Sequence, residues 1–112
     1  QPVDDADAHS ARPDYAMLIY PAYLDKGLDR SITPELKIDG ATPPMFIFGT
    51  ADDRHSNSVL VMGQALHLAG VPVEVHLLPE GGHGYGLRAG NRAAEAWPKL
   101  AEDWLHETVF GP

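Results

Sequence analysis

Three short apolar runs, separated by segments of helical or loop character, limit how this chain can fold. The runs occupy residues 15–20, 45–48 and 73–78. The first two are apolar throughout, which is typical of strands buried on both faces of a parallel sheet. In the third run, apolar residues alternate with Glu74 and His76, which favours an edge strand with one wet face. These runs are therefore predicted to be three strands.

Two helices are predicted to lie among these strands. Residues 56–69 carry apolar side chains at helical spacing, and Gly70 is a stop signal. The last helix is expected to begin near Trp97, because Pro98 suits the first helical position, and residues 91–96 are expected to form a separate turn. The apolar stripe of that helix is formed by Trp97, Leu100, Ala101, Trp104, Leu105 and Thr108.

Strands that alternate with helices form a parallel sheet with right-handed crossovers. The predicted class is therefore α/β, with about three parallel strands and flanking helices. A chain of 112 residues has room for one modest core, so residues 1–112 are expected to form a single domain, with residues 1–14 as an irregular lead-in. The connection over residues 21–44 is long enough to be functional or to cover another element.

Composition excludes several classes of function. The net charge is −8, from 8 basic and 16 acidic residues, which argues against nucleic acid and against an anionic membrane surface as partners. The absence of cysteine excludes disulfides, thiolate catalysis and Cys-based zinc sites. No apolar run is long enough to span a bilayer. The histidines lack metal-ligand spacing and the glycines lack dinucleotide-binding spacing, so no metal or other cofactor is expected.

A carboxylate and an imidazole follow the second and third predicted strands. Asp52 lies in the motif of residues 49–53, and His83 lies in the glycine-rich motif of residues 81–86. An acid after one strand and a histidine after the next is the order in which α/β serine hydrolases carry the last two triad members. A turn aspartate and a solvent-facing loop histidine are the alternatives, and the glycines that flank His83 favour the catalytic interpretation.

A serine nucleophile of this type lies on a Gly-x-Ser-x-Gly turn, and the 112 residues contain no such turn. The serines are Ser10, Ser31, Ser56 and Ser58, and none lies between paired glycines. We therefore expect the nucleophile and the oxyanion-hole loop in sequence before Gln1, and we expect the chain alone to be essentially inactive. The bare edge of the first strand agrees with this, since a missing amino-terminal half of the fold or a second copy would cover it.

The chain resembles the carboxyl-terminal part of bacterial α/β-hydrolases of the acetyl esterase, xylan esterase and feruloyl esterase type. The resemblance is carried by residues 12–24, 42–53, 57–58, 69–74, 79–88 and 97–105. It implies a partial α/β-hydrolase fold and a serine esterase that acts on a small ester or an acylated saccharide. In related hydrolases with an Asp-Asp pair at this place, the first aspartate is the triad acid, which corresponds to Asp52.

The resemblance also implies which residues line the site. Asp53 and Arg54 fall on the lining loop, and Arg54 and Tyr85 are the candidate substrate-binding residues, although a position facing water is favoured for Asp53 and Arg54. Two alternatives to the esterase remain. One is a serine peptidase of the same superfamily, and the other is a non-catalytic α/β module that self-associates through its strand edge. The Gly-Tyr-Gly sequence after His83 favours the esterase.

Overall fold

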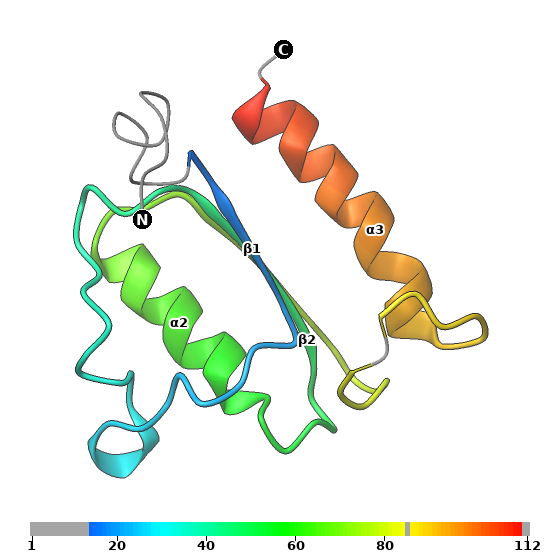
Figure 1. Ribbon diagram of the computed structural model, residues 1–112, viewed down its shortest axis with the longest axis horizontal. Helices are drawn as coiled ribbons and strands as arrows, with labels where there is room; N and C mark the ends of the chain where they lie inside the picture. Colours follow the sequence, from blue (N-terminus) through cyan, green and yellow to red (C-terminus); the bar gives the residue numbers. More distant parts are fainter. Residues whose placement is uncertain (1–13, 85, 111–112) are drawn as a thin grey trace, which may run out of the picture.

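The computed structural model describes residues 14–84 and 86–110, and these form one sheet between two helices (Figure 1). The elements are β1 (Ala16–Ile19), the 3-10 turn η1 (Leu28–Arg30), β2 (Met45–Thr50), α2 (Asn57–Leu68), β3 (Val73–Leu78), α3 (Arg92–Trp104) and the π-helical turn η2 (Leu105–Val109). The strands are all parallel, in the order β1-β2-β3. Helix α2 covers one face of the sheet and α3 covers the other (Figure 1). The predicted α/β class is confirmed.

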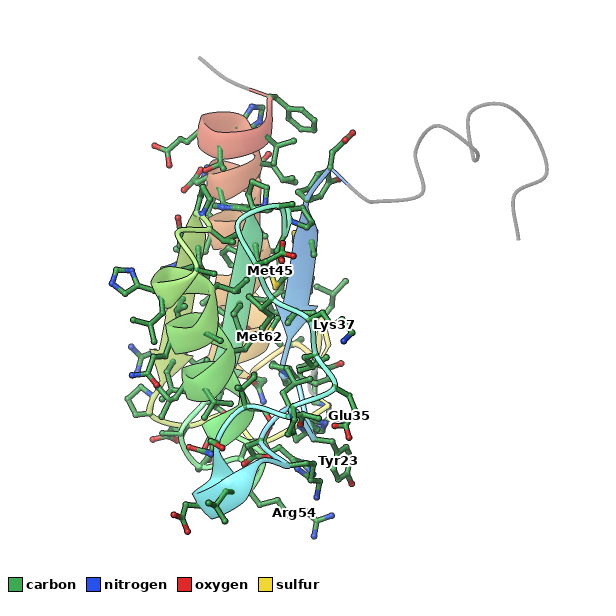
Figure 2. All side chains as sticks on the ribbon, turned by 90° about the vertical axis from the view of Figure 1, so that its left-hand side faces the viewer. Tyr23, Glu35, Lys37, Met45, Arg54 and Met62 are labelled. Carbon is green, nitrogen blue, oxygen red and sulfur yellow. The ribbon has the colours of Figure 1, made fainter. Side chains whose placement is uncertain are left out.

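The central strand β2 is buried along its whole length and supplies the core of both layers. Phe46 and Phe48 pack on the α3 side, whereas Met45 and Ile47 pack on the α2 side with Met62 (Figure 2). Successive side chains of a strand point to opposite faces, so one continuous apolar run serves two helices. Each large side chain buried in this way contributes about 1.5–3 kcal/mol to stability.

The outer strands depart from the prediction in one respect. The run at residues 15–20 is expected to be buried on both faces, but Met17 is 38% exposed, because β1 lies at the edge of the described sheet, where the two helices cover its faces less than those of β2. The third strand has the predicted bounds, and its edge position is confirmed. Strand β2 continues beyond the predicted end through Gly49 and Thr50.

Helix α2 lies within the predicted range and ends where the sequence indicated. Val59, Met62 and Leu66 form its buried side. Gly70 adopts a φ of +78°, a conformation in which glycine has no steric penalty, and its N–H donates to the carbonyl of His67. The chain thereby turns from α2 into β3.

Helix α3 begins earlier than expected, at Arg92, so the separate turn predicted over residues 91–96 is wrong. The side chain of Asn91 accepts a hydrogen bond from the Ala94 N–H and caps the helix. Pro98 therefore lies inside the helix, where it provides no N–H to the preceding turn. Thr108 is exposed rather than part of the apolar stripe, and the buried side chains of the helix are Ala93, Ala94, Ala101 and Trp104.

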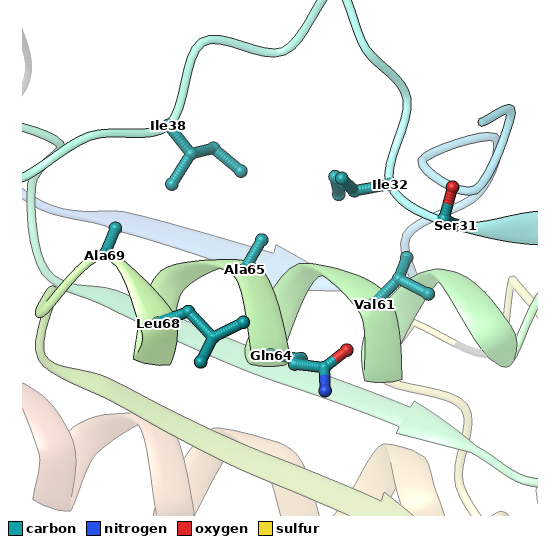
Figure 3. A pocket seen from close by; sticks show the side chains of 8 residues that line it. All are labelled: Ser31, Ile32, Ile38, Val61, Gln64, Ala65, Leu68 and Ala69. Atoms are coloured by element: carbon teal, nitrogen blue, oxygen red, sulfur yellow. The ribbon is translucent and has the colours of Figure 1, made fainter. Parts of the chain in front are cut away.

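The long connection between β1 and β2 packs over α2. Ile32 and Ile38 point from this connection toward the helix (Figure 3). Between the connection and α2 lies a mainly apolar cavity of about 420 Å³. It is lined by Ser31, Ile32, Ile38, Val61, Gln64, Ala65, Leu68 and Ala69. The expectation that this connection covers another element is confirmed. Among the described helices, none has the length and apolar character needed to cross a membrane.

Candidate active site

The loops that follow β2 and β3 meet at one edge of the sheet, because neighbouring parallel strands end on the same side. The two predicted motifs are thereby brought together. They line an open pocket of about 400 Å³ formed by Asp52, Asp53, Arg54, His55, Gly82 and His83.

The carboxylate in contact with the His83 imidazole belongs to Asp53. Asp53 Oδ2 lies 2.6 Å from His83 Nδ1, and its Oδ1 accepts the backbone N–H of His55 at 2.8 Å. The Asp53 side chain is only 2% exposed, whereas that of His83 is 40% exposed. An ionised carboxylate only accepts hydrogen bonds, so Nδ1 is then the donor and Nε2 is the nitrogen left to exchange a proton. The expectation that Asp53 faces water is therefore wrong, and a buried acid orients a half-exposed base.

Asp52 contacts the backbone of the histidine loop instead of the imidazole. Its Oδ1 accepts the N–H of Gly82 at 2.9 Å, and its Oδ2 accepts the N–H of Gly81 at 3.2 Å. These hydrogen bonds, that of Gly82 foremost, hold the pKa of Asp52 below its usual value. The expected pairing of Asp52 with His83 is therefore wrong in this structure, because the turn after β2 directs the two adjacent carboxylates to different partners.

Two further side chains hold the carbonyl groups of the same loop. The buried Thr50 hydroxyl donates to the Gly82 carbonyl at 2.6 Å, and Asn91 Nδ2 donates to the Gly81 carbonyl at 2.9 Å. With Asp52 on the N–H groups, the N–H and the carbonyl of both Gly81 and Gly82 are hydrogen-bonded. The loop is fixed by the end of β2 and by the first residue before α3.

Gly81 is required by this arrangement. Its φ is +149°, and a Cβ at this position would lie 2.8 Å from both Ala93 Cβ and Thr50 Cγ2. A side chain would therefore push the histidine loop away from β2 and α3.

Four rings form a row across the site. Centroid distances are 4.8 Å from Tyr20 to His83, 5.2 Å from His83 to His55 and 4.9 Å from His55 to Tyr23. Tyr23 lies near Arg54 at the end of the molecule where the strands finish (Figure 2). Arg54 is exposed, with its Nε 3.4 Å from His55 Nε2. The other candidate for substrate binding, Tyr85, lies outside the described residues.

Several residues of this site were missed in the sequence. An Asn directly before a helix is a capping signal, which would have identified Asn91 once α3 was placed correctly. Aspartate side chains in turns often accept the backbone N–H of the residue two positions later, which is an Asx turn. This preference could have indicated the contact between Asp53 and the His55 N–H. No sequence signal places Tyr20 on the imidazole, because that contact joins β1 to a loop distant in the chain.

Neither a metal-ligating cluster nor an exposed side chain at Ser58 is present among the described residues. No three His, Asp or Glu side chains among them are grouped as a metal site would require. Ser58 is fully buried, and its Oγ accepts the backbone N–H of Leu24 at 3.1 Å. This serine therefore serves the packing of the long connection on α2.

Comparison with solved structures decides the fold family. The acetyl ester-xyloside bifunctional hydrolase from Caldicellulosiruptor lactoaceticus matches 90% of this chain with a TM-score of 0.73 and 31% identity. MGS-M1, an α/β-hydrolase enzyme from a Medee basin deep-sea metagenome library, matches 86% with a TM-score of 0.69 and 31% identity. The chain has a partial α/β-hydrolase fold. The predicted resemblance to α/β-hydrolases is thereby confirmed for the fold, and the structural neighbours are hydrolases, some of them esterases.

Other comparisons set the extent of the likeness. An esterase from the planctomycete Thermogutta terrifontis matches 98% of this chain with a TM-score of 0.76, and at 20% identity it supports the fold alone. The chain spans 44%, 44% and 47% of these three structures, which is less than half of each. No protein-family model and no curated protein matches the sequence.

Proposed function

We propose that this chain supplies the acid and the base of a serine carboxylic-ester hydrolase, with Asp53 as the acid and His83 as the base. The observation that carries the proposal is the 2.6 Å contact between the buried Asp53 carboxylate and His83 Nδ1, at the strand ends of an α/β-hydrolase sheet. The two hydrolases at 31% identity among the structural neighbours support it.

The proposed mechanism follows from the two ring nitrogens. His83 Nε2 takes the proton of a serine hydroxyl as the oxygen attacks the ester carbonyl, and it then returns the proton to the leaving alcohol. Asp53 keeps Nδ1 protonated and stabilises the imidazolium that forms. Water repeats the cycle on the acyl-enzyme and releases the carboxylic acid.

The nucleophile of this mechanism lies outside the 112 residues, which contain no Gly-x-Ser-x-Gly turn. We expect residues 1–112 alone to hydrolyse esters at most in trace amounts, because an acid–base pair without a nucleophile and oxyanion hole gives little rate enhancement. The proposed partner of the sheet is further structure of the same fold, or a second copy, paired with the outer edge of β1.

The proposed substrate is a small ester or an acylated saccharide, with acetyl and feruloyl esters of xylan as the specific candidates. The net charge of −8 suits a neutral or cationic substrate. Arg54 remains the candidate for substrate binding, because it is exposed at the rim of the pocket beside His55.

The experiment is hydrolysis of p-nitrophenyl acetate by the full polypeptide that contains these residues. His83→Ala is expected to lower kcat by several orders of magnitude, and Asp53→Asn by a similar factor, because each removes part of a unit that acts together. Asp52→Asn is the matched control at the adjacent position, and it is expected to lose much less. Full activity of His83→Ala would overturn the proposal.

A further inference from the structure

Tyr20 holds an aromatic ring against the imidazole proposed as the base. The two ring centroids are 4.8 Å apart at an interplanar angle of 67°, an edge-to-face arrangement that aromatic rings favour. Tyr20 lies directly after β1, whereas His83 follows β3 at the opposite side of the sheet. The contact therefore spans the carboxyl end of the whole described sheet, above the end of β2.

The backbone of Tyr20 adopts a conformation that its residue type disfavours. Its φ is +44°, in the left-handed region where a side chain other than that of glycine meets the backbone. The next residue is Pro21, which further restricts the residue before it. The Tyr20 N–H donates to the Phe48 carbonyl at 2.6 Å, so the strained residue is tied to β2. Strain of this kind persists where surrounding contacts fix it, and it gathers at functional sites.

The His83 ring needs such a contact. Asp53 fixes only one point of the imidazole, at Nδ1, and the ring is 40% exposed. A single hydrogen bond permits the ring plane to tilt about that point. The rings of Tyr20, at 4.8 Å, and of His55, at 5.2 Å, pack against the imidazole. The nearer of these contacts, that of Tyr20, restricts the tilt and thereby helps to fix where Nε2 points.

We propose that Tyr20 is a positioning residue for His83, and that its ring, held by a left-handed backbone after β1, sets the orientation of the imidazole together with Asp53. The inference rests on the proposed function in that the base is His83. It goes beyond that function in giving a role to the segment after β1, which contributes no acid, base or nucleophile.

The chain offers a matched control in Tyr23. This residue is also a tyrosine with a positive φ, 63°, in the same segment, but its ring contacts His55 at 4.9 Å rather than His83. Loss of the Tyr23 ring therefore removes an equivalent aromatic group from the row without removing the direct contact on the base.

The test is NMR spectroscopy of the imidazole protons in the 112-residue chain, with His83 assigned from the His83→Gln variant. We expect nuclear Overhauser contacts between the Tyr20 and His83 rings in the unchanged chain. Tyr20→Leu should shift the His83 ring resonances and Tyr20→Phe should leave them nearly unchanged, because Phe keeps the ring. Tyr23→Leu should shift the resonances of His55 more than those of His83.

Two results would overturn the inference. One is the absence of ring-to-ring Overhauser contacts in the folded chain, a measurement that needs no variant to fold. The other is an equal shift of the His83 ring resonances in the Tyr20→Leu and Tyr23→Leu variants. In the full polypeptide, Tyr20→Leu should lower kcat with little change in KM. The NMR measurements need no catalysis. If the full polypeptide does not hydrolyse esters, the proposed function is overturned, whereas the measured contact between Tyr20 and His83 still stands.

Discussion

Asp53 Oδ2 lies 2.6 Å from His83 Nδ1, whereas the adjacent Asp52 carboxylate binds the backbone N–H groups of Gly82 and Gly81. The two neighbouring acids thus position His83 in different ways. Asp53 orients the imidazole, and Asp52 fixes the loop that carries it. This division leads to different expected results for the two residues, which are equal in charge and adjacent in sequence.

The Asp52 contacts predict a dependence of stability on pH. The pKa of Asp52 is lowered in the folded chain, chiefly by the Gly82 N–H, so the ionised carboxylate stabilises the folded state above the unfolded value of 3.8. This stabilisation is lost as the pH falls below 3.8 through the lower folded value. In urea unfolding, wild type should exceed Asp52→Asn in stability at neutral pH, and the difference should shrink below pH 3.8. A difference that stays constant into acid would contradict the assignment.

Thr50 should contribute through its hydroxyl group. Thr50→Val keeps the shape of the side chain but removes the donor to the Gly82 carbonyl, at a fully buried position. We expect a loss of about 0.5–1.5 kcal/mol in the free energy of unfolding, because the partly buried Gly82 carbonyl loses its hydrogen-bond donor. Thr50→Ser keeps the donor and is the control for the hydrogen bond. A loss for Thr50→Ser as large as that for Thr50→Val would contradict a dominant role of the hydroxyl group.

Gly81 and Gly84 provide a matched pair of glycine substitutions. Both have a positive φ, but only at Gly81 would a Cβ meet other atoms, at 2.8 Å from Ala93 and Thr50. Gly81→Ala should therefore lower the unfolding free energy by about 1–3 kcal/mol more than Gly84→Ala does, since it adds overpacking to backbone strain. Thermal unfolding followed by circular dichroism measures the difference. Similar melting temperatures for Gly81→Ala and Gly84→Ala would contradict the close packing of Gly81 against Ala93 and Thr50.

Asn91 serves two groups with one side chain, and two variants separate them. Asn91→Asp keeps an oxygen for the Ala94 N–H but loses the donor to the Gly81 carbonyl, whereas Asn91→Ala loses both. The cap is worth about 1 kcal/mol, so Asn91→Ala should be less stable than Asn91→Asp by about that amount. Amide exchange near residue 81 should rise in both variants. Protection that is unchanged in Asn91→Asp would refute the tie between loop and helix.

Much of the fold could be predicted from sequence, because apolar pattern alone specifies it. The alternation in residues 73–78 predicts the bounds of β3, and the spacing of apolar residues predicts α2. The start of α3 could not be obtained from Pro98, because the Asn91 cap and the buried Ala93 and Ala94 outweigh the hydrogen bond that proline removes. A single local preference was overruled by packing.

The site could be predicted only to the level of its two loops. Sequence places an acidic pair after one strand and a histidine after the next, and the structure brings both together. Which of two adjacent carboxylates reaches the ring depends on the turn over Asp53 and His55, whose conformation is fixed by backbone hydrogen bonds. The contacts of Tyr20 and Thr50 depend on tertiary packing, which no local pattern of residues specifies.

The most direct test of the central claim is detection of the His83 Nδ1 proton by ¹H–¹⁵N NMR in the wild-type chain and in the Asp53→Asn and Asp52→Asn variants. A proton held between Nδ1 and a carboxylate 2.6 Å away gives a far-downfield resonance. We predict that this resonance is present in wild type, retained in Asp52→Asn and lost in Asp53→Asn. Loss in Asp52→Asn with retention in Asp53→Asn would contradict the account and identify Asp52 as the acid.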